Sequence, residues 1–167
     1  GIIRNHYVGR TFIEPTDKIR HFGVKLKHNA NRSVIAGKNV VLIDDSIVRG
    51  TTSKKIVQMI RDAGAKKVTM LIASPPTKSP CFYGIDMPKS KDLIASNHTV
   101  EEICSIIGAD HLAYISVDGL YQAVNGENRN NDLPQYCDAC FTNNYPIELV
   151  DIKNKNIKNS QLSFLEE

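Results

Sequence analysis

The sequence predicts an α/β fold in which a parallel sheet is flanked by helices. Three short and mostly apolar runs, at residues 38–43, 67–73 and 111–115, are typical of strands. Two segments with apolar residues at helical spacing, 52–63 and 99–107, separate them. Strands that alternate with helices in this way run in the same direction, and the helices pack on the sheet. We therefore expect one α/β domain or a part of one.

The first strand, at residues 38–43, ends in Val-Val-Leu-Ile, and we expect it to be buried. In the segment that follows, Ile56, Met59 and Ile60 recur at the spacing of one helix face, which predicts a helix over residues 52–63. Gly64 is placed to end this helix.

The second strand, at residues 67–73, is close to a continuous apolar run, as buried parallel strands are. Three prolines then predict an irregular stretch, and residues 92–95 are expected to form a helical turn. Thr99 and Glu102 have the spacing of a capping box, which predicts a helix that ends at Gly108.

The third strand, at residues 111–115, precedes a last helix, which Ser116 caps and which runs to about Val124. The Asn-rich stretch 125–132 is typical of turns. At the other end of the chain, residues 1–32 are polar and basic, and we expect a loop there with a short strand near Tyr7. We assign residues 1–150 to the domain and 151–167 to a polar tail.

Composition narrows the class of protein. Of 167 residues, 41% are hydrophobic and 23% are charged, which is ordinary for a globular domain, and the net charge of +3 gives no reason to expect nucleic acid as a partner. No signal peptide is recognisable and no apolar run is long enough to span a bilayer, so we predict a cytoplasmic protein without a membrane partner. Four cysteines in that compartment are expected to be reduced or metal-bound.

One motif carries most of the chemistry. The strand at residues 38–43 leads directly into Asp44 and Asp45, and a small, hydroxyl-rich loop then opens the helix. That loop consists of Ser46, Ile47, Val48, Arg49, Gly50, Thr51 and Thr52. Gly50 lets the backbone approach an oxyanion, while loop hydroxyls, with that of Ser53, and amides at the start of the helix can hold a phosphate. The two carboxylates suit ribose hydroxyls and a Mg²⁺ ion.

An ordinary strand-turn-helix corner is the simpler explanation of this motif, because Asp, Ser and Gly are favoured in turns. Turn chemistry alone does not require two acids, an arginine, a glycine and three hydroxyls in this order. The pattern resembles the phosphoribosyl pyrophosphate (PRPP) signature of phosphoribosyltransferases. The run Tyr-Val-Gly-Arg-Thr-Phe-Ile at residues 7–13 and the run Phe-Tyr-Gly-Ile-Asp-Met-Pro at residues 82–88 further resemble the glutamine PRPP amidotransferase family.

The resemblance covers residues 1 to about 146. It implies the type I phosphoribosyltransferase fold, incomplete here at its N-terminal side. We expect the chain to be the C-terminal part of that domain within a longer protein, with a glutaminase domain upstream that this chain does not contain.

The resemblance also assigns roles to residues. Asp44 and Asp45 would hold the ribose hydroxyls and help to place Mg²⁺, and the loop 46–52 would take the 5-phosphate. Lys27 would reach the pyrophosphate, and Arg10 lies in the family's Gly-Arg-Thr-Phe stretch. Without the resemblance, Lys27 is more simply a solvated surface lysine. The basic segment 10–32 has the character of a lid that closes over the ligand, and a permanently flexible linker is the alternative.

The activity implied is the formation of 5-phosphoribosylamine from PRPP and glutamine-derived ammonia, the first committed step of de novo purine synthesis. Purine nucleotides are implied as feedback inhibitors and a homo-oligomer as the assembly, and the chain alone is not expected to use glutamine. A PRPP-sensing repressor would show a helix-turn-helix or a strongly basic face, which this sequence lacks. A salvage transferase for a nucleobase is disfavoured by the run at residues 7–13 and by the cysteines.

The cysteines form a second constellation. Cys137 and Cys140 make a C-x₂-C pair, whose spacing lets both thiolates face one metal. Some family members carry a [4Fe–4S] cluster, and Cys81, Cys137 and Cys140 match three of its ligands, with the fourth upstream of this chain. Free buried thiols or a zinc site are the alternatives. Cys104 is expected to be a packed core residue.

Overall fold

The computed structural model describes residues 1–4 and 28–147. Its main sheet has three parallel strands, β3 (Asn39–Asp44), β4 (Lys67–Ile72) and β5 (His111–Tyr114), in the order β3-β4-β5. The register pairs Asp44 with Ile72 and Ile72 with Tyr114, so the carboxyl ends of all three strands meet at one edge. The α/β class that the sequence predicts is confirmed.

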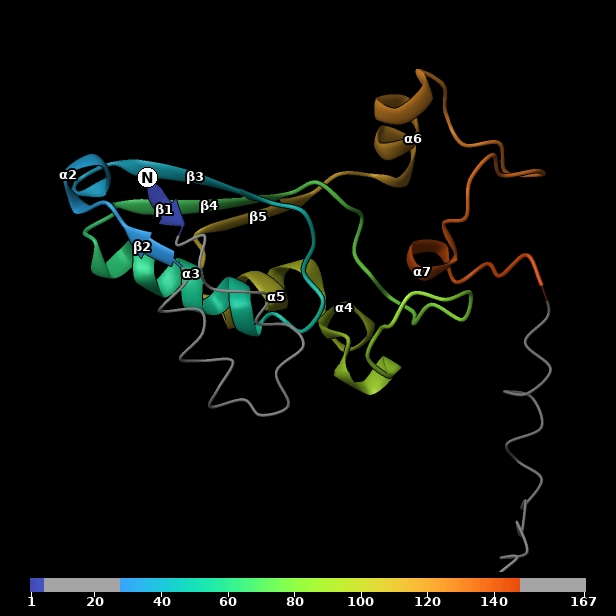
Figure 1. Ribbon diagram of the computed structural model, residues 1–167, viewed down its shortest axis with the longest axis horizontal. Coiled ribbons are helices and arrows are strands. Elements are labelled where there is room, and N and C mark those ends of the chain that lie inside the picture. The colour runs from blue at the N-terminus through green and yellow to red at the C-terminus, as the bar shows by residue number, and fades with distance from the viewer. Residues whose placement is uncertain (5–27, 148–167) are drawn as a thin grey trace, which may run out of the picture.

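The helices that connect these strands cover one face of the sheet. Figure 1 shows α3 (Thr51–Asp62) and α5 (Val100–Ile107) together on the same side of β3, β4 and β5. The strands follow each other across the sheet in chain order, and right-handed crossovers in one direction place successive helices on the same face. Side chains between the two layers form the core, including the fully buried Ile60, Met70 and Ile103.

Within residues 1–4 and 28–147, nothing covers the other face of the sheet, which corrects the expectation that the first strand is buried. On β3, side chains alternate between the two faces, and Val41 and Ile43 are 59% and 71% exposed. The sequence of β3 has the continuous apolar character of a strand covered on both faces. Only the face toward α3 and α5 is covered by the described residues.

Most predicted elements lie within one residue of their expected bounds. The capping box on α5 is present, with Thr99 accepting from the Glu102 N–H and the Glu102 carboxylate accepting from the Thr99 N–H. Gly108 follows α5 in the left-handed conformation, with a φ of 77°. Ser116 caps α6 (Val117–Asn125) as predicted.

Four short helices differ from the prediction made from the sequence. The turn expected at residues 92–95 is instead a 3₁₀ turn, η2 (Ser90–Asp92), followed by α4 (Ile94–Asn97). Neither α2 (Arg32–Ile35) nor α7 (Ala139–Thr142) was predicted. Helices of three or four residues are too short to show hydrophobic periodicity, which explains why the sequence does not reveal them.

The N-terminal region is more ordered than expected at its two ends. β1 (Ile2–Arg4) pairs antiparallel with β2 (His28–Ala30), where the sequence predicted only loop. The last residues of the predicted lid, 28–32, therefore belong to β2 and to the start of α2. Tyr7, Arg10 and Lys27 lie outside the described residues, as do the rest of the predicted lid and the tail 151–167.

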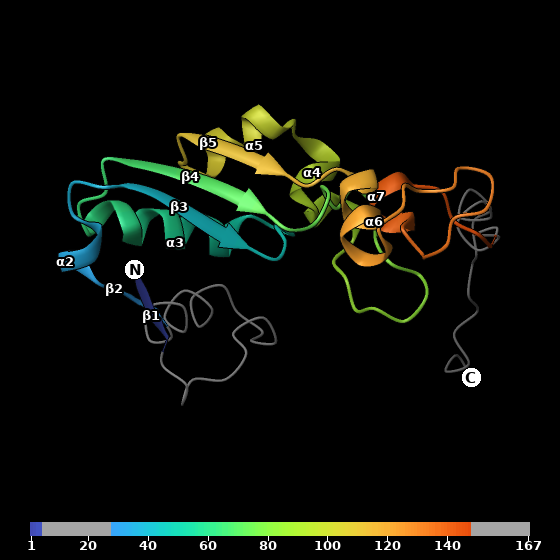
Figure 2. The same ribbon diagram turned by 90° about the horizontal axis from the view of Figure 1, so that it is seen from above.

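Residues 116–147 lie beyond the carboxyl ends of the strands, where Figures 1 and 2 both show α6 and α7 apart from α3 and α5. Within 1–4 and 28–147, no helix combines the length and apolar character needed to cross a membrane.

Candidate functional site

The acidic pair lies at the carboxyl edge of the sheet. Asp44 is the last residue of β3 and Asp45 begins the loop. The Asp45 N–H donates to the Asp44 carboxylate at 3.1 Å, and the Ser46 N–H donates to the Asp45 carboxylate at 2.7 Å. These bonds hold both carboxylates against the first backbone amides of the loop.

The two carboxylates differ in environment. Burial raises the pKa of Asp44, and the Asp45 carboxylate beside it raises the pKa further. The hydrogen bond from the Asp45 N–H and the His28 ring act in the opposite direction. Asp45 itself is exposed. His28, whose ring lowers the pKa of Asp44, is the first residue of β2.

The loop requires a glycine at position 50. Its φ of 75° is left-handed, and a Cβ built at this position would lie 2.7 Å from Ile94 Cδ1. The Ile94 N–H donates to the Val48 carbonyl at 2.9 Å, so α4 pins the loop from the side. The Ile47 side chain is 2% exposed and packs in the core. Of the predicted PRPP-binding residues, Ile47 can therefore offer a ligand only its backbone.

The amino end of α3 is open to an anion. Gly50 is its N-cap and provides no side-chain cap, whereas Thr99 and Ser116 cap α5 and α6. The free amides of a helix's first turn and its dipole favour a bound phosphate. Thr51 and Thr52 are exposed there and can add their hydroxyls. Ser53 is 3% exposed, so the expectation that its hydroxyl faces a phosphate is wrong.

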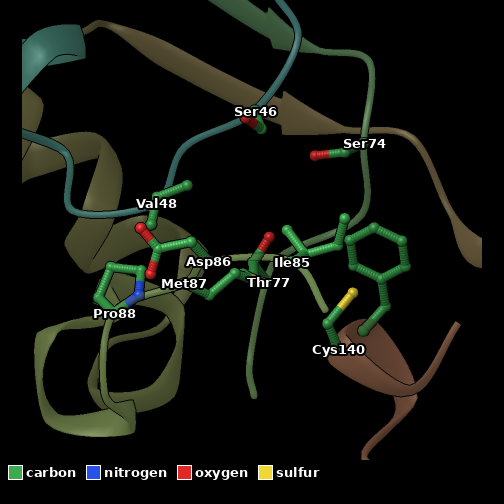
Figure 3. Close-up of a pocket in the computed structure, with 10 residues that line it drawn as sticks. Ser46, Val48, Ser74, Thr77, Ile85, Asp86, Met87, Pro88 and Cys140 are labelled. Atoms are coloured by element: carbon green, nitrogen blue, oxygen red, sulfur yellow. The ribbon is translucent and has the colours of Figure 1, made fainter. Parts of the chain in front are cut away.

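A pocket of about 270 Å³ opens beside the loop (Figure 3). Ser46 and Cys140 lie on opposite sides of it, and Asp86 and Pro88 form a further wall. The residues that line it are Ser46, Val48, Ser74, Thr77, Ile85, Asp86, Met87, Pro88, Cys140 and Phe141. The Ser74 hydroxyl is buried and has no hydrogen-bond partner among the residues that the structure describes. Residues 85–88, 140 and 141 come from distant parts of the sequence, so no local pattern could have assigned them to this pocket.

The three candidate cluster ligands come from two neighbouring segments. Burial raises the pKa of the Cys140 thiol, and the nearby Cys137 and Cys81 thiols raise it further. Across the part of the chain that the structure describes, no three His, Cys, Asp or Glu side chains are arranged to hold a metal ion. The thiols thus share a neighbourhood and a donor chemistry that suits iron or zinc, without forming a closed metal site. Cys104 is half-buried on α5, and its thiol donates to the Ala109 carbonyl at 3.3 Å.

A parallel sheet flanked by helices, with an acidic pair at its carboxyl edge, is consistent with the type I phosphoribosyltransferase fold. Two solved structures share this arrangement over 89% of the chain. One is the glutamine PRPP amidotransferase of Bacillus subtilis complexed with ADP and GMP, with a TM-score of 0.74 and 52% identity. The other, described as the allosteric regulatory enzyme of purine biosynthesis, has a TM-score of 0.71 and 53% identity.

Comparison of the sequence with curated proteins finds the same kind of enzyme as the solved structures. The amidophosphoribosyltransferase of Rhizobium etli is 60% identical over 166 residues, which is 99% of the chain, and that of Archaeoglobus fulgidus is 54% identical over 149 residues. Over the region it spans, the chain belongs to the amidophosphoribosyltransferase family. It covers 33% and 32% of the length of these two relatives. No protein-family model matches the chain.

Proposed function

We propose that the protein to which this chain belongs binds PRPP and transfers its ribose 5-phosphate to ammonia released from glutamine. The observation that carries the proposal is the continuity of Asp44 and Asp45 with a loop that ends at the uncapped amino end of α3. The names and the identity of the relatives support it, because they match nearly the whole chain.

In this proposal the chain's own residues hold the two ends of the ribose phosphate. Thr51, Thr52 and the first amides of α3 bind the 5-phosphate, and the carboxylates of Asp44 and Asp45 accept hydrogen bonds from the ribose hydroxyls. Nitrogen attacks C1 as the C1–oxygen bond to pyrophosphate breaks, and the new amine then loses a proton. Such a reaction depends mostly on electrostatic stabilisation of the departing group.

Mg²⁺ suits this edge, because it prefers oxygen ligands and needs only one or two carboxylates beside the substrate's phosphates. The exposed Asp45 and half-buried Asp44 offer such oxygens at the start of the loop. When bound, the ion would neutralise charge on the pyrophosphate. Lys27 and Arg10 are proposed to contact that group as well, and segment 10–32 to close over it.

Regulation and assembly extend the proposal. The related Bacillus subtilis structure is a complex with ADP and GMP, which supports purine nucleotides as regulators of this protein too. A homo-oligomer, which the family resemblance implies, and a cytoplasmic location, which rests on the lack of a recognisable signal peptide, stay predictions.

The thiols support a further cofactor. We propose that Cys81, Cys137 and Cys140 bind a [4Fe–4S] cluster together with a cysteine from another part of the protein. The soft donor chemistry of three neighbouring thiols is the support. Zinc on the same ligands is the competing proposal.

The decisive experiment measures phosphoribosylamine formation from PRPP and ammonium salts by the complete protein, which bypasses glutamine hydrolysis. Asp44→Asn and Asp45→Asn should each lower turnover by at least about tenfold, or about 1.4 kcal/mol of transition-state stabilisation. Asp62→Asn is the matched control, because Asp62 is exposed at the far end of α3. Equal turnover in Asp44→Asn, Asp45→Asn and the Asp62→Asn control would contradict the proposal.

A further inference from the structure

The lobe formed by residues 116–147 has almost no apolar core of its own. Its buried hydrophobic residues are Tyr121 and Ala139, and neither belongs to the main core cluster between the sheet and its helices. Figures 1 and 2 show this lobe beyond the carboxyl edge of the sheet. Hydrophobic burial on the scale of the main core therefore does not hold it in place, and other interactions must do so.

A polar cluster lies at the centre of the lobe. The Asp138 side chain is 6% exposed and pairs with the Arg129 guanidinium, which is 10% exposed. The same carboxylate accepts hydrogen bonds from the Tyr121 hydroxyl at 2.9 Å and the Thr142 hydroxyl at 3.1 Å. We call Asp138, Arg129, Tyr121 and Thr142 the Asp138 cluster. A buried carboxylate with these partners has its charge compensated, and removing one partner leaves a buried charge without compensation.

The Asp138 cluster reaches the pocket through one short helix. Asp138 is the N-cap of α7, which carries Cys140 and Phe141 to the pocket wall. The Cys140 carbonyl accepts hydrogen bonds from the N–H groups of Lys78 and Ser79, at 2.9 and 3.0 Å. These two bonds join α7 to the segment after β4 that leads to Cys81. Holding Asp138 in place therefore holds this wall of the pocket.

We propose that the Asp138 cluster positions Cys140 and Phe141 at the pocket wall, and that it does so without a metal ion. Asp138, Arg129 and Tyr121 are positioning residues in this account, because they act through α7. The inference goes beyond the proposed function, since it holds whether or not PRPP binds at the neighbouring loop. It also differs from an arrangement in which thiolate ligation is what ties α7 to the Cys81 segment.

Hydrogen exchange of the complete protein, kept metal-free with a chelator, tests the proposal. The amides of Lys78 and Ser79 report the docking of α7 directly. They should be protected in the parent protein, and exchange should be at least about tenfold faster in Asp138→Asn. The amide of Gly108, which donates to the Cys104 carbonyl in the main domain, should keep its rate. Asp132→Asn is the matched control, because Asp132 is an exposed acid of the same lobe.

Variants of Arg129 separate charge from shape. Arg129→Lys retains a cation and should retain most of the protection at Lys78 and Ser79, whereas Arg129→Gln should lose it. Tyr121→Phe removes one hydroxyl and should give a smaller loss in the same direction. If Asp138→Asn also accelerates exchange at Gly108, its effect is not confined to the lobe. Exchange at Lys78 and Ser79 in Arg129→Lys, Arg129→Gln and Tyr121→Phe then tests the proposal.

Two results would overturn the proposal. One is exchange in Asp138→Asn and Arg129→Gln that matches the Asp132→Asn control. The other is a parent protein in which Lys78 and Ser79 gain protection only when Fe²⁺ or Zn²⁺ is added, which would assign the positioning to thiolate ligation. Failure of the phosphoribosylamine assay would affect neither result, because exchange is measured without substrate.

Discussion

Replacing Gly50 with alanine tests the loop geometry on which the phosphate site depends. The left-handed φ of 75° costs a residue with a Cβ about 1–2 kcal/mol. The new Cβ would also lie 2.7 Å from Ile94 Cδ1, and accommodating such an intrusion in a packed region costs about 1–3 kcal/mol. We therefore expect Gly50→Ala to lower the free energy of unfolding by about 2–5 kcal/mol, the sum of the two effects.

Gly37 provides the matched control, because its φ is 72° and a Cβ there would meet nothing within 4 Å. Gly37→Ala should lose only the conformational part, about 1–2 kcal/mol. Adding Ile94→Val to Gly50→Ala removes the clashing methyl group and should recover a part of the loss. Equilibrium urea unfolding measures all four proteins, with hydrogen exchange in α3 as the local readout. Equal losses at the two glycines, together with no recovery from Ile94→Val, would refute the reasoning.

Three further outcomes are expected. Burial and the Asp45 carboxylate raise the pKa of Asp44. As the solution is acidified, Mg²⁺ affinity should therefore begin to fall at a higher pH than it would at an ordinary aspartate. Asp45→Asn should move that fall to lower pH, which calorimetric titration with Mg²⁺ at several pH values measures. The hydrogen bond from the Val68 N–H lowers the pKa of Asp110, so its stabilisation is present above the unfolded value of about 3.9 and lost as pH falls through the folded value. Asp110→Asn should thus be less stable than the parent at neutral pH, and urea unfolding in acid should show the difference vanish. Protein purified without oxygen should contain about four irons per chain by elemental assay, and Cys137→Ser should lower that content, whereas colourless protein with zinc or no metal would exclude the cluster.

Local signals predicted much of this fold because the physics behind them is local. The capping box of Thr99 and Glu102 involves four consecutive residues, and α5 begins where it predicts. The acidic pair followed by Gly50 is also a local pattern, and it correctly indicated the carboxyl edge of a strand and the start of a helix. Family resemblance rested on such runs, and the relatives confirm it.

Other features depend on which segments meet, and no local pattern encodes that. The apolar run of β3 suggested burial on both faces, but Ile43 is exposed because the crossovers place α3 and α5 on one side only. Ser53 follows Thr51 and Thr52 with similar chemistry, yet helix geometry turns it into the interior.

The sequence by itself therefore determined the α/β class and the order of the main strands and helices, because periodicity, capping and turn chemistry act over a few neighbouring residues. The residues of a ribose phosphate site stay a prediction from the sequence. The tertiary structure alone decided that Asp86 and Cys140 share a pocket with Ser46, and that Asp138 is buried against Arg129. Side chains from separate segments acquire these environments only when the chain is folded, since burial and pairing depend on contacts between residues that are distant in sequence.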